Sequence, residues 1–164
     1  MAEVANSKLL QQIEGIQNIQ DALVVLVKTE WNATVVDELE RGCIAILQQH
    51  KIAFKTLVVP GAVEIPFAIQ HYWTSTPQKP AAFIALGCVV RGDTPHFEYV
   101  CQSVTSGITQ LNLALPVPVV FGILTVNTDE QAAERIGGKH GHKGEEAAIT
   151  ALKMMLLSVE INKA

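Results

Sequence analysis

Short apolar runs recur along the chain, and most are followed by a stretch in which apolar residues return every three or four positions. The runs are rich in Val, Ile, Leu and Ala. Continuous apolar runs of about four to eight residues are typical of strands that are covered on both faces of a parallel sheet. The pattern predicts four strands, at residues 22–27, 54–59, 81–86 and 119–124.

The segments between these runs have helical periodicity. A helix is predicted from Asn32 onward, and a shorter one at residues 65–73. Thr128, with a glutamine three positions later, fits a capping box that begins a short helix ending near residues 137–138. The last helix is expected to begin at about Gly144. The apolar stripes consist of Val35, Val36, Leu39, Cys43, Ile46 and Leu47, then Phe97, Val100, Val104, Ile108 and Leu111, and finally Ala148, Leu152, Met155 and Val159.

Strands that alternate with helices predict an α/β fold, a three-layer αβα sandwich around a four-stranded, mainly parallel sheet. We expect a single domain over residues 21–164, preceded by an N-terminal arm or edge strand at residues 1–20. Right-handed crossovers bring the carboxyl ends of the strands to one edge, where such sheets bind ligands. The loops expected at this edge are residues 28–32, 59–65, 87–96 and 125–128.

Composition and charge narrow the class of protein. Of the 164 residues, 49% are apolar and 17% are charged, a balance typical of one globular domain with a large core. The net charge of -4 argues against a protein that binds nucleic acids regardless of sequence. Neither a membrane-spanning segment nor a signal peptide is evident, and the three cysteines lack metal-binding spacing, so we expect reduced thiols in the cytoplasm. The glycine motifs of dinucleotide and P-loop nucleotide sites do not occur.

Residues 87–100 carry the strongest candidate chemistry. An apolar strand reaches Gly87, a short polar loop follows, and a helix is expected to begin at Thr94 and Pro95. A helix amino terminus offers free N–H groups to an anion, and His96 in its first turn could exchange protons near neutral pH. An ordinary helix start capped by Thr94 would give the same pattern. A nucleophilic pair of Cys88 with His96 is a further alternative, although a small side chain packed at the strand end explains Cys88 better.

Four other features of the sequence have both functional and structural explanations. Glu64 lies in an otherwise apolar loop and would bind a polyhydroxylated ligand or cap a helix. Trp31 is either part of the core or a platform for a planar ring. Arg135 could chelate a phosphate or stabilise the end of a short helix. The cluster at residues 139–143 contains two histidines flanked by lysines, which disfavour a metal cation, so a mobile glycine-rich basic loop is expected there.

Four ordered motifs together resemble the lumazine synthase family, over nearly the whole chain from Ala22 onward. They are PGAVEIP at residues 60–66, GCVVRGDTPHFEYV at residues 87–100, FGILT at residues 121–125 and ERIGGKHGHKG at residues 134–144. The resemblance implies a flavodoxin-like fold and a step of riboflavin biosynthesis. In that step 5-amino-6-(D-ribitylamino)uracil condenses with 3,4-dihydroxy-2-butanone 4-phosphate, giving 6,7-dimethyl-8-ribityllumazine, phosphate and water.

The resemblance also implies a role for each matched residue. His96 would be the general acid and base, and the phosphate would be held by Asp93, through its backbone N–H, and by Thr94. Arg135 and Phe121 would reach the site from a neighbouring subunit, and Lys143 would assist with charge. The residues expected to bind the pyrimidine and its ribityl chain are Trp31, Ala62, Val63, Glu64, Cys88, Val89 and Val90.

No metal and no redox cofactor are implied by the resemblance. The family builds pentamers, which in some members stack as decamers or assemble into sixty-subunit icosahedral shells, and riboflavin synthase is a possible partner. Trp31 stands where phenylalanine is common in the family, and Cys88 often corresponds to threonine. A lumazine-binding or flavin-binding protein of the same fold, without catalysis, is the alternative function, and a cysteine hydrolase is a second one.

Overall fold

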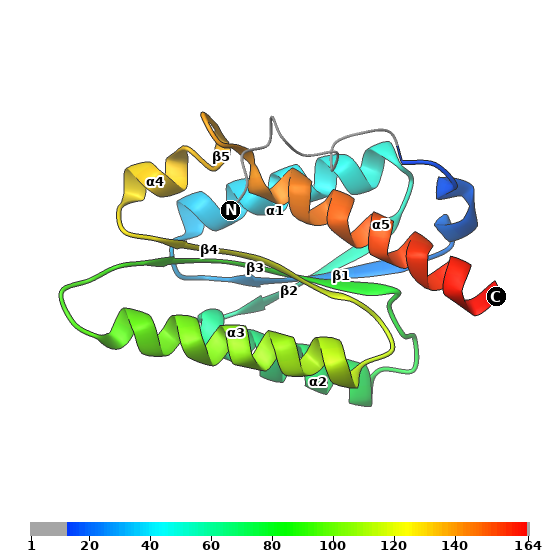
Figure 1. Cartoon of the computed structure of the whole chain (residues 1–164), viewed down its shortest axis with the longest axis horizontal. Helices are drawn as coiled ribbons and strands as arrows, with labels where there is room; N and C mark the ends of the chain where they lie inside the picture. Colours follow the sequence, from blue (N-terminus) through cyan, green and yellow to red (C-terminus); the bar gives the residue numbers. More distant parts are fainter. Residues whose placement is uncertain (1–12, 164) are drawn as a thin grey trace.

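The computed structural model describes residues 13–163 and has a parallel β-sheet at its centre (Figure 1). The order of the sheet is β2-β1-β3-β4, and every neighbouring pair runs parallel. This confirms the predicted α/β fold with a flavodoxin-like, three-layer arrangement. The strands are β1 (Leu23–Thr29), β2 (Ala53–Val59), β3 (Ala82–Val90) and β4 (Val119–Val126).

Helices cover both faces of the sheet (Figure 1). Helices α1 (Ala33–Gln49) and α5 (Lys143–Lys163) pack on one face. Helices α2 (Ile65–Ser75) and α3 (His96–Ala114) pack on the other. No helix in the described part of the chain is both long and apolar enough to cross a membrane.

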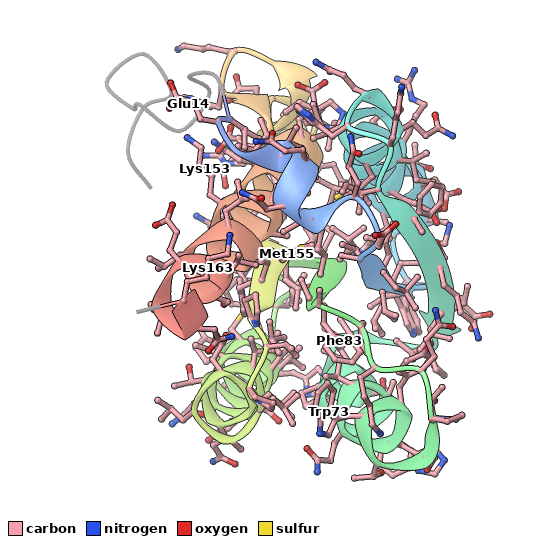
Figure 2. All side chains as sticks on the ribbon, turned by 90° about the vertical axis from the view of Figure 1, so that its right-hand side faces the viewer. Glu14, Trp73, Phe83, Lys153, Met155 and Lys163 are labelled. Carbon is pink, nitrogen blue, oxygen red and sulfur yellow. The ribbon has the colours of Figure 1, made fainter. Side chains whose placement is uncertain are left out.

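Two apolar cores result, one on each face of the sheet. Successive residues of a strand point to opposite faces, so Val24 and Leu26 belong to the core under α1 and α5, while Val25 and Val27 belong to the other. Burial on both faces explains why the strand runs are continuous in apolar residues. Figure 2 labels one residue of each core: Met155 of α5 belongs to the core under α1 and α5, and Phe83 of β3 belongs to the core under α2 and α3.

Strand β3 is longer than the sequence pattern predicted. It continues through Gly87 and Cys88 to Val90, so the expectation that a loop begins at Gly87 was wrong. Strand β4 explains the extension, because its residues pair with β3 as far as Val126 opposite Val90. Only Arg91 and the turn of residues 92–95 therefore separate β3 from α3.

The segment after β4 also differs from the prediction. Thr128 caps helix α4 (Asp129–Ala133) as expected, since its hydroxyl accepts a hydrogen bond from the backbone N–H of Gln131 at 3.3 Å. The helix ends at Ala133, however, and is followed by a hairpin of β5 (Ile136–Gly138) and β6 (Gly141–His142).

A mobile basic loop at residues 139–143 was therefore a wrong expectation. The hairpin packs on α1, because a Cβ placed on Gly42 would lie 2.2 Å from Cε1 of His142. Lys143 follows the hairpin and is buried, with Nζ 2.7 and 2.8 Å from the two carboxylate oxygens of Glu146. Tertiary packing orders this glycine-rich stretch, which its composition alone did not reveal.

The expected arm or edge strand at residues 1–20 falls mostly outside the described residues. Residues 13–20 of this segment contain a short 3-10 helix, Ile16–Ile19, and no strand. Ile19 is buried against the core formed with α1 and α5. The domain boundary at residue 21 stays a prediction.

Candidate active site

A cavity of about 570 Å³ opens at the carboxyl edge of the sheet, where the fold was expected to bind a ligand. Its walls come from the ends of β1 and β3, the turn before α2, and the start of α3. The lining residues are Thr29, Trp31, Asn32, Gly61, Ala62, Val63, Glu64, Cys88, Val89, Val90, His96 and Val100. Eight of these twelve were singled out from the sequence.

Two loops of this wall are joined by backbone hydrogen bonds. The N–H of Glu30 donates to the carbonyl of Val59 at 2.9 Å, and that of Trp31 donates to Pro60 at 3.3 Å. Gly61 lies so close to both loops that a Cβ there would be 3.0 Å from Oε2 of Glu64 and 3.6 Å from the Trp31 ring. The carboxylate of Glu64 and the indole of Trp31 both lie beside Gly61 and line the same cavity.

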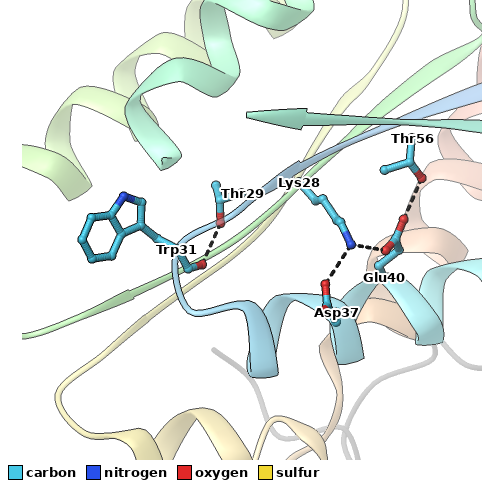
Figure 3. Close-up of polar contacts among 6 residues, drawn as sticks. All are labelled: Lys28, Thr29, Trp31, Asp37, Glu40 and Thr56. Carbon is cyan, nitrogen blue, oxygen red and sulfur yellow. Dashed lines mark hydrogen bonds and ion pairs between the residues drawn. The ribbon is translucent and has the colours of Figure 1, made fainter. Parts of the chain in front are cut away.

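Trp31 is not a core residue, because 72% of it is exposed. Figure 3 shows its indole projecting from the turn after β1, away from the polar network of Lys28. In that network Lys28 Nζ lies 2.8 Å from Asp37 and 2.5 Å from Glu40 of α1. The network fixes the end of β1 on α1. The Trp31 ring lies outside the network and remains free to stack on a planar ligand.

Asn32 is a lining residue that the sequence analysis did not propose. Its backbone has a φ of 58°, a left-handed conformation that asparagine adopts more readily than most residues. Its side-chain Nδ2 donates to the carbonyl oxygen of Cys88 at 2.7 Å and joins the ends of β1 and β3. An asparagine at a strand-to-helix turn was the available signal, but its partner 56 residues away could not be found from sequence.

Helix α3 begins at His96, one or two residues later than predicted, and presents this histidine to the cavity. The Thr94 hydroxyl lies 3.5 Å from the backbone nitrogen of His96, a long distance for a capping hydrogen bond. Asp93 and Thr94 belong to the exposed turn before the helix and are not cavity-lining residues. Glu64 is also exposed, although its neighbours in the sequence are apolar.

Phe121 and Arg135 do not line the cavity of their own chain. Phe121 lies in the edge strand β4, opposite Ala85, and 40% of it is exposed. Arg135 follows α4, and its Nη1 donates to the carbonyl of Gln131 at 2.7 Å. Lys143, held by Glu146, lies outside the cavity walls as well.

The Cys88 thiol has the properties of a packed side chain rather than a nucleophile. Burial, helped by the negative charge of Asp129, raises its pKa from 9.0 to about 11. A protonated thiol is a poor nucleophile, which disfavours the cysteine hydrolase alternative. Among residues 13–163, moreover, no three His, Cys, Asp or Glu side chains are grouped to hold a metal ion.

The fold and the cavity together define an α/β protein with a candidate ligand site at the carboxyl edge of its sheet, lined by an indole, a carboxylate and an imidazole. A family model described as 6,7-dimethyl-8-ribityllumazine synthase matches residues 21–158. The chain therefore belongs to the 6,7-dimethyl-8-ribityllumazine synthase family.

Individual relatives agree with this assignment. The chain is 48% identical over 144 residues to 6,7-dimethyl-8-ribityllumazine synthase of Porphyromonas gingivalis, covering 86% of this chain and 88% of the other. It is 41% identical over 158 residues to the protein of that name from Cytophaga hutchinsonii, covering 94% and 98%. The protein of that name from Bdellovibrio bacteriovorus is 44% identical over 142 residues, covering 86% of this chain and 78% of its own.

Proposed function

We propose that this chain condenses 5-amino-6-(D-ribitylamino)uracil with 3,4-dihydroxy-2-butanone 4-phosphate to 6,7-dimethyl-8-ribityllumazine, phosphate and water, in riboflavin biosynthesis. The observation that carries the proposal is the set of groups in one cavity: the indole of Trp31, the carboxylate of Glu64 and the imidazole of His96. Family membership adds independent support.

The walls of the cavity suit the two ends of the pyrimidine substrate. The Trp31 ring would stack on the pyrimidine, and the peptide groups at the end of β3, from Cys88 to Val90, would hydrogen-bond its edge. The ribityl chain would lie along Ala62 and Val63, with its hydroxyls donating to the Glu64 carboxylate.

The turn before α3 would hold the phosphate of the second substrate through the backbone N–H of Asp93 and the hydroxyl of Thr94.

The uracil amine then attacks the ketone to form an imine, and phosphate elimination, ring closure and dehydration follow. Each step moves a proton, and the imidazole of His96 at the cavity wall would give and take it. Binding both substrates side by side supplies proximity.

The same proposal makes the site a shared one. Phe121 and Arg135 lie outside the cavity of their own chain, so they would complete the site of a neighbour, Phe121 against the ring and Arg135 against the phosphate. We propose a homopentamer, or a larger assembly of pentamers such as an icosahedral shell, acting in the cytoplasm with riboflavin synthase as a possible partner. The free thiols of Cys43, Cys88 and Cys101 agree with a reducing compartment.

The test is to mix the two substrates with the purified protein and to follow lumazine absorbance and fluorescence. We expect turnover well above the uncatalysed rate. His96→Ala should lower kcat by roughly a hundredfold, because general acid and base catalysis by one group is worth at least that much. The KM values of both substrates should change little.

His50→Ala is the matched control, because His50 follows the carboxyl end of α1 and is not a cavity residue. This variant should retain the wild-type kcat. Tight binding of the lumazine with no formation above the uncatalysed rate would contradict the proposal and favour the binding protein of the same fold.

A further inference from the structure

Arg91 is a charged residue at the site for which the proposed chemistry has no role. It directly follows β3 and precedes the turn that leads to His96. Its backbone N–H donates to the carbonyl of Val126 at 2.9 Å, and its Nε donates to Oδ1 of Asn127 at 2.8 Å. These two contacts attach the residue to the end of β4.

The guanidinium of Arg91 also reaches the first turn of α3. It forms an ion pair with Glu98, and its central carbon lies 4.2 Å from the centre of the Phe97 ring. The hydrogen bond from Arg91 lowers the pKa of the Glu98 carboxyl, so this pair is fully charged at neutral pH. The charge of Arg91 is therefore already matched by a carboxylate, and its side chain is not part of the cavity wall.

The turn itself has few other attachments. Residues 92–95 are exposed, and a Cβ on Gly92 would have no atom within 4 Å. Within the described chain, the hydrogen bonds of these four residues lead only into α3, from His96 to Thr94 and from Glu98 to Pro95. The side chain of Arg91 is thus the polar link between the start of α3 and the end of β4.

We propose that Arg91 is a positioning residue for the phosphate of the substrate: it holds the turn of residues 92–95 against β4, with Glu98 and Asn127 as its two anchors. This rests on the proposed function, in which that turn binds the phosphate. The N–H groups of the turn and the imidazole of His96 then keep a fixed position and orientation relative to one another. Proton transfer and the departure of the phosphate both depend on that geometry.

Direct binding of the phosphate by Arg91 is the competing role, and Glu98 distinguishes the two. If Arg91 positions the turn, Glu98→Gln removes one anchor and weakens phosphate binding. If Arg91 is itself a phosphate ligand, Glu98→Gln frees the guanidinium, removes a nearby negative charge and leaves phosphate binding equal or stronger.

The experiment measures KM separately for the two substrates in Glu98→Gln and Asn127→Ala, together with inorganic phosphate affinity by calorimetry. We expect each variant to raise the KM of the butanone phosphate and the dissociation constant of inorganic phosphate by roughly two- to fivefold, the range for an exposed ion pair. The KM of the pyrimidine should stay within error, a separation that general loss of folding would not produce. Arg91→Lys should be intermediate, because lysine can pair with Glu98 but lacks the planar fork.

Arg41→Gln is the matched control, since Arg41 pairs with Glu38 on α1 in another exposed arginine–glutamate pair and does not line the cavity. It should leave all three constants unchanged. Unchanged or tighter phosphate binding in Glu98→Gln would overturn the positioning role. Inorganic phosphate is measured without turnover, so weakened binding in the variants would support the role even if the wild-type protein formed no lumazine.

Discussion

At the scale of single residues, burial decides which cavity groups are chemically active. Cys88 lines the cavity but lies at the end of a buried strand, with a pKa of about 11. Only roughly one thiol in ten thousand is then a thiolate at pH 7, compared with about one in a hundred at the ordinary value. Cys43 is buried between α1 and α5, and burial raises its pKa to about 12.

The first prediction concerns these two thiols. Cys88→Ala should keep kcat within about twofold, because the protonated thiol takes no part in proton transfer or attack. The free energy of unfolding should be independent of these thiols below about pH 9 and should fall as the pH rises from 9 toward 11 and 12. Over that window the unfolded chain releases protons that the folded chain retains. Activity assays and urea titrations between pH 7 and pH 11 measure both effects.

A Cys88→Ala variant with normal stability but no activity would contradict this prediction and support the alternative in which Cys88 is a nucleophile. The double variant Cys43→Ala/Cys88→Ala is the control for the pH effect. It should lose less stability at alkaline pH than the wild-type chain, because it lacks the two thiols whose pKa values are raised on folding.

The sequence revealed the site residues that are unusual where they stand. Trp31 was noticed because aromatic residues are scarce in the chain and this one follows a strand, and Glu64 because an acid interrupts an apolar loop. Both line the cavity. Asn32 and Arg91 were missed because their importance depends on partners 56 and 36 residues away. Single-sequence patterns carry no information on such pairs. The exposure of Glu64 was likewise not apparent, since neighbours in sequence do not determine burial.

At the scale of elements, α1 and α5 approach each other so closely at Gly144 that a side chain would not fit there. Gly144 lies in the first turn of α5, and its carbonyl accepts a hydrogen bond from the Cys43 thiol at 2.9 Å. A Cβ on Gly144 would be 2.0 Å from the backbone oxygen of Leu39. Backbone atoms cannot move aside as a flexible side chain can, so the two helices would have to separate.

The second prediction follows from this contact. Gly144→Ala should lower the free energy of unfolding by about 1 to 3 kcal/mol, the usual cost of overpacking a core. Chemical denaturation measures the change. Gly92→Ala is the control, because a Cβ there meets no atom within 4 Å, and its stability should equal that of the wild type. Equal stabilities for Gly144→Ala and the wild type would mean that α5 does not pack this closely on α1.

Elements with strong periodicity were predictable, and the departures have local physical causes. The four parallel strands and the stripes of α1, α3 and α5 follow from burial on one or two faces. Residues 136–142 were not predictable, because the two short glycine-containing strands lie against α1, where His142 packs on Gly42, and the sequence does not show that contact. The extension of β3 beyond Gly87 likewise depends on the pairing offered by β4.

At the scale of the whole molecule, the surface of a single chain carries large apolar side chains that the chain itself does not cover. Large apolar side chains on both sides of the sheet are exposed, a property that often marks surfaces buried in an assembly. Trp31 and Phe121 are among them. The others include Val58, Val63, Phe67, Tyr99, Leu113, Met154, Leu157 and Ile161. This agrees with the proposal that neighbouring copies complete the cavity.

The last prediction tests that completion by complementation. If each cavity takes His96 from one chain and Arg135 from its neighbour, the variants His96→Ala and Arg135→Ala should each be nearly inactive. Co-assembly of the two in equal amounts should then restore activity to about one quarter of wild type, because in a cyclic, head-to-tail assembly a random neighbour supplies the missing group at one site in four. Light scattering would establish that the mixed particles have the wild-type mass. Mixing the separately assembled variants without dissociation is the control and should restore nothing. A fully active monomer, or co-assembled particles of normal mass without recovered activity, would show that Arg135 does not complete a neighbouring site.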